Sequence, residues 1–409
     1  EPNNGNAAEP GYEPPEPQRP TEQLAAAASP GYPYHPGAEA TPPPSESIFK
    51  KVFGSFAIWD VLLVFIPVAF YAEAHHMYIL TFFSSCAGII PLAGWMGKAT
   101  EHLADKFGDA LGGLLNATFG NPCEFIIALA ALRAGPAYYD IVKASITGSI
   151  IGNVLLVLGA SMIAGGMKYP VQTFNRTGAM TSATLLALAA VSLIVPAVFH
   201  HFSKATHNED ELALGISLVL FSVYILSLIF SLKTHKHLHT RPGESHVVDD
   251  ALGTRGWSVG RSIGVLLGAT VLVAILSELL VHTVDKCAVD LGMNKVFIGV
   301  VLVAIIGNAA EHSTAIFMAM KDKMDLAMNI ALGSGAQIAL LIAPLLVFIS
   351  FLLGKPMDLR FTEFEVLSVV ASVIVLQYVA SDGECNWLEG VQLLAVYAIL
   401  STAFFFMAP

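Results

Sequence analysis

The chain alternates long apolar runs with short polar connections from residue 55 to its end. An α-helix needs about 20 mostly apolar residues to cross a bilayer, and only helices or closed barrels can cross. Short segments of alternating polarity, which would indicate barrel strands, are absent from the sequence. The pattern predicts an all-α polytopic membrane protein with about eleven transmembrane helices. The predicted spans are 55–73, 78–97, 110–132, 141–164, 177–199, 212–232, 262–283, 296–320, 325–353, 363–380 and 387–407.

Composition supports a chain whose main partner is the lipid bilayer. Hydrophobic residues make up 55% of the chain and charged residues only 13%, whereas soluble domains carry about 25% charged residues. The net charge of −11 is not concentrated into a recognition surface, and no basic patch with interleaved aromatic residues indicates nucleic acid binding. The four cysteines are widely spaced and form no Cys-x-x-Cys motif, so free thiols are expected.

The polar segments divide the chain into five parts. Residues 1–46 are rich in Pro, Gly, Ala and Glu and predict a disordered cytosolic tail. An extra N-terminal transmembrane helix is expected within 47–76. The longest internal linker, 233–261, is predicted to be cytosolic, and it separates two five-helix repeats at 77–232 and 262–409.

Short motifs recur in the same order in the two halves. Because each half contains an odd number of spans, the halves must face opposite ways across the membrane. Inverted repeats are typical of secondary transporters, whose site lies near the midplane where the repeats meet. The recurring pairs are GNPCE at 120–124 with GNAAE at 307–311, ATEHL at 99–103 with LSELL at 276–280, and Gly148-Ser149 with Gly333-Ser334.

Lys and Arg residues indicate the orientation of the chain. If the N-terminus is cytosolic, fourteen of the 21 basic residues fall on the cytosolic side of the predicted spans. The positive-inside rule therefore favours a cytosolic N-terminus. With eleven spans, the C-terminus is then expected on the far side.

Glu124 and Glu311 are the main candidates for binding chemistry. A charged side chain at the centre of a span costs about 2.5–3.5 kcal/mol, so something must offset the cost of two. Inverted symmetry brings the two positions together, where carboxylates repel unless they share protons or hold a cation. Oxygen ligands suit a hard divalent ion such as Ca²⁺. A protonated glutamate held by a hydrogen bond between helices is the alternative.

Residues around the glutamates complete the predicted site. Gly120, Asn121, Gly307 and Asn308 are poor helix formers, and broken helices expose carbonyl groups to a cation, although glycine also serves close helix packing. Neutral polar residues on the next spans are expected to complete an oxygen shell, hold the glutamates, or simply join helices. These residues are Ser149, Asn153, Ser334 and Gln337.

Three further polar residues are weaker candidates. Glu101 and Glu278 lie near the ends of their spans and could pass protons to the central pair or act in a gate. For Glu101 an ordinary interfacial acid is an equal alternative. His312 follows Glu311 directly and could tune it, or make a structural hydrogen bond.

These motifs resemble those of the calcium/proton antiporters within the cation/Ca²⁺ exchanger superfamily. The resemblance covers roughly 50–409 and is closest to fungal and plant vacuolar exchangers in "GNAAEHSTAIFMAMKDKMDLAMNIALGS" and "DGECNWLEGVQLLAVYAILSTAFFF". It implies that Glu124 and Glu311 bind Ca²⁺ and protons in turn, with Asn121 and Asn308 as motif partners. It also implies a vacuolar membrane protein with no resident cofactor, and Mn²⁺ as a second possible substrate. This chain departs from the family pattern at Pro122-Cys123, His102 and Gly335-Ala336.

Other functions remain as alternatives. A Na⁺-driven Ca²⁺ exchanger would share the glutamates, but no added cluster of Asp, Ser or Thr suggests Na⁺ sites. An intramembrane metalloenzyme would need a ligand set such as His-Glu-x-x-His, which "AEHST" does not supply. A cation channel is the third alternative. The sequence leaves stoichiometry and oligomeric state open.

Overall fold

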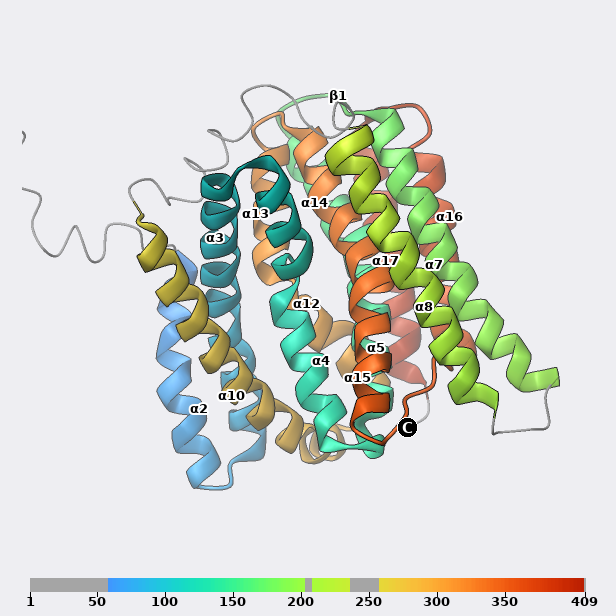
Figure 1. Cartoon of the computed structure of the whole chain (residues 1–409). Coiled ribbons are helices and arrows are strands. Elements are labelled where there is room, and N and C mark those ends of the chain that lie inside the picture. Colours follow the sequence, from blue (N-terminus) through green and yellow to red (C-terminus); the bar gives the residue numbers. More distant parts are fainter. Residues whose placement is uncertain (1–57, 203–207, 236–256, 408–409) are drawn as a thin grey trace, which may run out of the picture. The chain divides into compact units, whose positions relative to one another are not determined.

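The computed structural model describes residues 58–202, 208–235 and 257–407. The predicted tail at 1–46, the first residues of the extra N-terminal helix and most of the 233–261 linker lie outside the described residues. The described chain is helical apart from one short pair of strands (Figure 1), so the predicted all-α fold is confirmed.

Helices follow the predicted apolar runs closely. Labels beginning with η denote 3₁₀ or π segments. In chain order the elements are η1 (Ile58–Val64), α2 (Phe65–Ala74), α3 (Tyr78–Phe119), α4 (Pro122–Ala134), η2 (Pro136–Tyr138), α5 (Tyr139–Ile151), η3 (Gly152–Val157), α6 (Leu158–Gly166), β1 (Gln172–Thr173), α7 (Arg176–Phe202), α8 (Asn208–Ile229), η4 (Phe230–Thr234), α10 (Val259–Leu291), α11 (Lys295–Phe297), η6 (Ile298–Val303), α12 (Ala304–Gly307), α13 (Ala309–Ala319), α14 (Met324–Gln337), η7 (Ile338–Ile342), α15 (Ala343–Leu352), α16 (Glu363–Val379), β2 (Glu384–Cys385) and α17 (Trp387–Phe406).

Seven helical stretches in the described ranges are long and apolar enough to cross a membrane, or eight if the bent pair at 295–319 counts as one span. The other three predicted spans, 55–73, 110–132 and 363–380, coincide with shorter or interrupted helices. Helix formation thus follows the hydrophobic pattern. The count of eleven crossings stays a prediction.

The main difference from the sequence prediction lies in α3, which joins two predicted spans into one helical run of 42 residues. A straight helix of that length would measure about 63 Å, twice the thickness of a bilayer core. The run turns back on itself instead. This reversal is shown by Gly112, where an added Cβ would lie 2.1 Å from the carbonyl oxygen of Ala104. Residues eight apart in a straight helix would be separated by about 12 Å. Figure 1 shows the turn at the top of α3.

The first described helix, α2, packs against α3 and α10 (Figure 1). A Cβ added at Gly88 of α3 would lie 3.1 Å from Ile66 of α2 and 3.2 Å from Leu276 of α10, so the three helices meet there. A hydrogen bond also joins α3 to η1, the segment that precedes α2: Trp95 Nε1 of α3 donates to the buried Asp60 of η1 at 2.9 Å. The N-terminal span is therefore fixed to the α3–α10 pair.

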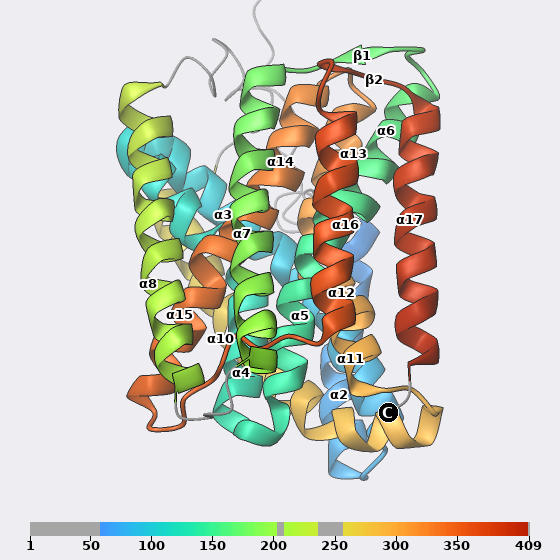
Figure 2. The same ribbon diagram turned by 90° about the vertical axis from the view of Figure 1, so that its right-hand side faces the viewer.

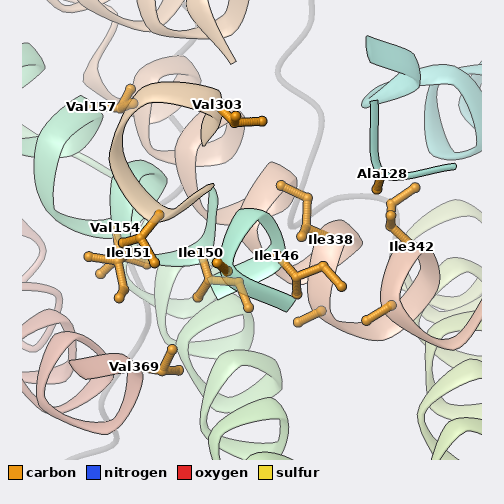
Figure 3. Packing of buried hydrophobic residues seen from close by; sticks show 14 of the residues in the cluster. Ala128, Ile146, Ile150, Ile151, Val154, Val157, Val303, Ile338, Ile342 and Val369 are labelled. Atoms are coloured by element: carbon orange, nitrogen blue, oxygen red, sulfur yellow. The ribbon is translucent and has the colours of Figure 1, made fainter. Parts of the chain in front are cut away.

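The two halves cross closely between α5 and η6. A Cβ added at Gly148 would lie 2.1 Å from the carbonyl oxygen of Val300, and one added at Gly299 would lie 2.6 Å from Ala144 Cβ. Buried apolar residues of α5, η3 and η7 surround this crossing (Figure 3), among them Ile146, Ile150, Val154, Ile338 and Ile342. Glycine at 148 therefore allows the two helices to pack closely.

Two polar connections are joined by the strands. β1 pairs with β2 in antiparallel register, with Gln172 opposite Cys385. Burial raises the pKa of the Cys385 thiol to about 12, so the thiol stays protonated. All four cysteines are buried and free, as expected: Cys86, Cys123, Cys287 and Cys385. Figures 1 and 2 show the strands at the end of the helices nearer α13, with α4 toward the opposite end.

Candidate ion-binding site

Two interrupted helices form the centre of the candidate site. The first breaks at Gly120-Asn121, between the end of α3 and the start of α4. The second breaks at Asn308, between α12 and α13, where the helix axis bends by 60°. Both breaks were expected from the glycine and asparagine residues there, and Pro122 suits the first position of α4 because a helix start has no use for its missing N–H.

Glu124 and Glu311 each lie in the first turn of the helix that follows a break. Both residues are half-buried, and the N-terminal end of a helix favours a carboxylate. Their carboxyl groups interact electrostatically. Within the described residues, Glu124 Oε1 and Glu311 Oε2 are buried without a hydrogen-bond partner. A buried oxygen of this kind is costly unless it binds a proton or a cation.

Glu124 packs directly on the break of the other repeat. A Cβ added at Gly307 would lie 3.2 Å from Glu124 Cγ and 3.7 Å from its Oε1. Gly307 therefore gives the first glutamate room beside the break that precedes the second. This contact brings the two halves of the predicted site together.

Asn121 binds two polar side chains of α14. Its Nδ2 donates to Gln337 Oε1 at 2.8 Å, and its Oδ1 accepts from Ser334 Oγ at 2.6 Å. All three residues are buried. The break in the first repeat is thus held by side chains from the second.

Asn308 makes the corresponding contacts in the other direction. Its Nδ2 donates to Ser149 Oγ at 2.9 Å, and its Oδ1 accepts from Asn153 Nδ2 at 3.1 Å. Asn153 Nδ2 also donates to Ser334 Oγ at 2.8 Å, which joins the two halves into one network. The π-helical segment η3 begins beside Asn153, and π segments are frequent at functional sites.

The two sets of hydrogen bonds are related by exchange of the repeats. Each asparagine contacts a serine and an amide from the opposite repeat. The amides do not occupy matching positions, because Asn153 lies four residues after Ser149 while Gln337 lies three after Ser334. Glutamine is one methylene longer, and both reach their asparagine. The imperfect spacing in the sequence is compatible with equivalent contacts.

The Ser334 hydroxyl connects Glu311 to this network. Ser334 donates its single proton to Asn121 and accepts from Asn153, and it also hydrogen-bonds to Glu311. A hydroxyl has one proton and two lone pairs. Because a hydroxyl proton can rotate, Ser334 can donate either to Asn121 Oδ1 or to the Glu311 carboxylate. Ser334 therefore links Glu311 to the network and can stabilise its ionised form.

A small cavity of about 10 Å³ borders Glu124, enough for roughly one water molecule. Its polar lining comes from Glu124, Ser149 and Ser145, and its other walls are apolar. Ser145 was missed by the sequence reasoning. Its spacing of four residues before Ser149 places both on one helix face, which was the available signal.

The weaker candidates lie outside the network. Glu278 Oε1 is 4.0 Å from Arg133 Nη1, both side chains are 67% exposed, and this pair connects α10 to α4. Glu101 is half-buried on α3. His312 is half-buried, and in the described chain its Nε2 has no hydrogen-bond partner. A structural hydrogen bond, the alternative role considered for His312, is therefore not made through Nε2 to any described residue.

The candidate site offers only a few charged groups as ligands for a metal ion. No cluster of three or more His, Cys, Asp or Glu side chains is placed to hold a metal ion in the described ranges. A cation here would therefore rely on the two carboxylates and on neutral oxygens from amides, hydroxyls and main-chain carbonyls. Such a mixed oxygen shell is typical of Ca²⁺ sites.

The family model for sodium/calcium exchanger proteins matches residues 77–233 and 261–406, once in each half. The chain belongs to the sodium/calcium exchanger family. Within this family it is similar to a Ca²⁺/H⁺ antiporter of Aphanothece halophytica, with 42% identity over 84% of this chain and 95% of the relative. It is also similar to the vacuolar calcium ion transporter of Schizosaccharomyces pombe, with 38% identity over 85% of this chain and 84% of the relative.

The fold agrees with that of YfkE, a solved Ca²⁺/H⁺ antiporter protein. The structure of native YfkE superposes with a TM-score of 0.74 at 38% identity, covering 86% of this chain and 100% of the other. The two interrupted helices therefore lie within an integral membrane fold that this chain shares with YfkE.

Proposed function

We propose that this protein is a secondary active antiporter that exchanges cytosolic Ca²⁺ for protons from an acidic compartment. The observation that carries the proposal is the meeting of the two repeats at Glu124 and Glu311, each with a buried oxygen that lacks a partner within the described chain. The relatives described above, one of which is a Ca²⁺/H⁺ antiporter, support the assignment.

Competition for the two carboxylates couples the fluxes. With both glutamates protonated, the two carboxyl groups of the site are neutral. With both ionised, two negative charges repel unless a divalent cation lies between them. A site that holds either two protons or one Ca²⁺ exchanges them as it opens to each side of the membrane in turn. No covalent chemistry or resident cofactor is needed.

Orientation and compartment are part of the proposal. The charge bias supports a cytosolic N-terminus and a lumenal C-terminus. The similarity to a vacuolar transporter supports the vacuolar membrane. We further propose that 77–232 and 262–409 are inverted repeats, a proposal supported by the exchange-related hydrogen bonds of Asn121 and Asn308.

Transport by purified protein in liposomes tests the function. An imposed pH gradient should drive Ca²⁺ uptake without Na⁺, and Mn²⁺ as competitor reports its place as a substrate. The Glu311→Gln variant should lose this uptake, while Glu211→Gln, an exposed residue of α8, should retain it. Uptake that requires Na⁺ would indicate a Na⁺-driven exchanger, and flux insensitive to the pH gradient would indicate a channel. Either result would refute the proposal.

A further inference from the structure

Each repeat sends a connection to the tip of the helical hairpin that carries the other repeat's glutamate. The Glu124 hairpin consists of α4, the turn at 135–138 and α5. The Glu311 hairpin consists of α13, the turn at 320–323 and α14. Glu124 and Glu311 lie at the inner ends, and the outer ends of α4 and α13 lie about 15 Å and about 12 Å farther along the helix axes. The outer contacts are separate from the site network.

The α6–α7 connection holds the Glu311 hairpin through Gln172. This residue is only 2% exposed, and its Nε2 donates to the carbonyl oxygen of Ala319 at 2.9 Å and to Asp322 Oδ1 at 3.0 Å. Asp322 has a φ of +59°, in the left-handed region that aspartate, asparagine and glycine adopt more readily than other residues. The main-chain N–H of Asn175 also donates to Asp325. The end of α13 is thus fixed by the first repeat.

Gln172 is held firmly in position. Its main chain is paired in the ladder opposite Cys385. Its side chain lies against Gly165, where an added Cβ would come within 1.8 Å of Gln172 Oε1. The close approach leaves the amide little freedom to turn away from Ala319.

The α15–α16 connection makes the corresponding contact with the Glu124 hairpin. Lys143 of α5 is 8% exposed, and its Nζ donates to Asp358 Oδ1 and to the carbonyl oxygen of Arg360, both at 2.9 Å. Tyr139 donates to the carbonyl oxygen of Lys355 at 2.5 Å. A buried ammonium group is costly unless it is paired, so Lys143 stabilises the fold only when Asp358 and the Arg360 carbonyl lie beside it. Figure 2 shows the two connections at opposite ends of the helices.

We propose that Gln172 and Lys143 are positioning residues for ion binding, because each joins the outer end of one glutamate-bearing hairpin to a connection of the opposite repeat. A short half-helix is attached to its inner neighbour only through a break, so its tilt depends on the contact at its tip. The two tip contacts keep the carboxylates at the separation that a shared cation requires. The Ca²⁺ uptake measurement rests on the proposed antiport function. The hydrogen–deuterium exchange measurement does not.

A double-mutant cycle tests the contact at Gln172. The Gln172→Glu carboxylate cannot donate to Ala319, and it faces the carboxylate of Asp322. Asp322→Asn supplies a donor to that new carboxylate and tolerates the positive φ. Thr173→Ser, at the exposed neighbouring strand position, is the matched control.

Hydrogen–deuterium exchange and Ca²⁺ uptake are measured on each full-length variant. In Gln172→Glu, amide exchange should rise in 309–319 but not in 122–134, and the half-saturating Ca²⁺ concentration should rise about 5- to 10-fold with a smaller change in maximal rate. Lys143→Gln should show the reverse exchange pattern. Adding Asp322→Asn to Gln172→Glu should recover part of both effects, because the contact with Ala319 stays lost, and Thr173→Ser should match the wild type.

Other outcomes overturn the inference. Equal loosening of 122–134 and 309–319 in Gln172→Glu would indicate general destabilisation, and unchanged exchange would show that the contact does not position α13. A double variant no better than Gln172→Glu would exclude the Asp322 contact. If the wild type shows no pH-driven Ca²⁺ uptake, the proposed function fails, while the exchange pattern still decides the role of Gln172.

Discussion

The two halves of the site share a motif but differ in their surroundings. Glu311 hydrogen-bonds to Ser334 and so to the amide network, whereas Glu124 borders a small cavity beside Ser145. His312 follows Glu311, and Phe125 occupies the matching place after Glu124. The two copies of the motif thus each supply a carboxyl group, but with different neighbours. Glu311 therefore has a side-chain hydrogen-bond partner, whereas Glu124 borders a small void.

The largest expected effect comes from removing either carboxylate. If both glutamates hold the same cation, Glu124→Gln and Glu311→Gln should each reduce pH-driven Ca²⁺ uptake at least about 100-fold, because the remaining charge cannot bind Ca²⁺ and two protons in turn. Uptake into liposomes measures this, with equal reconstitution checked by gel filtration. A variant that keeps normal uptake would show that the two repeats do not share one site.

Matching glycines offer the second comparison. Gly148→Ala should destabilise the protein by about 1–3 kcal/mol, because the new methyl group would overlap the Val300 carbonyl. Gly333→Ala, at the equivalent position, has nothing within 4 Å and should be neutral or slightly stabilising. Thermal unfolding in detergent compares the two. Equal effects would contradict the asymmetric packing of the repeats.

Asparagines at the breaks should show smaller and similar effects. Asn121→Ala and Asn308→Ala each remove contacts to the opposite repeat, so the half-saturating Ca²⁺ concentration should rise about tenfold in both. Initial uptake rates over a Ca²⁺ series provide the measurement. A large effect in one variant and none in the other would show that only one break shapes the site.

The smallest effect is expected at the cavity. Ser145→Ala removes a polar group beside Glu124 and should change uptake by about two- to threefold, mainly in its dependence on pH. The equivalent position in the second repeat is Ile330, so Ile330→Val serves as the control. A pH series of uptake rates compares them, and an unchanged profile in Ser145→Ala would show that this cavity does not affect proton binding at Glu124.

The sequence was informative where a residue type is costly. An intramembrane glutamate, a duplicated motif and a helix-breaking asparagine are visible without coordinates, and the structure brings Asn121, Asn308, Ser149, Asn153, Ser334 and Gln337 into one network. Hydrophobic runs likewise indicated where helices form. These features follow from local composition and spacing.

Other features depend on tertiary distance and were not predictable. Nothing local distinguishes Gly148, packed against Val300, from the open Gly333. The reversal of α3 falls between the predicted spans 78–97 and 110–132, and what the sequence did not predict is that the connection between them is itself helical. Gln172 lies in a connection and Lys143 near the end of a span, and polar residues are common at both kinds of position. Only the tertiary approach of the other repeat gives these two residues their partners.

Proton release on Ca²⁺ binding tests the central claim most directly. Purified protein in detergent and weak buffer is mixed with Ca²⁺ while a pH indicator is followed. We expect the wild type to release protons as Ca²⁺ binds, and a double variant with Glu124→Gln and Glu311→Gln to release none. Release from the double variant equal to that of the wild type, or Ca²⁺ binding by the wild type without release, would contradict a site in which the two ligands compete for the same carboxylates.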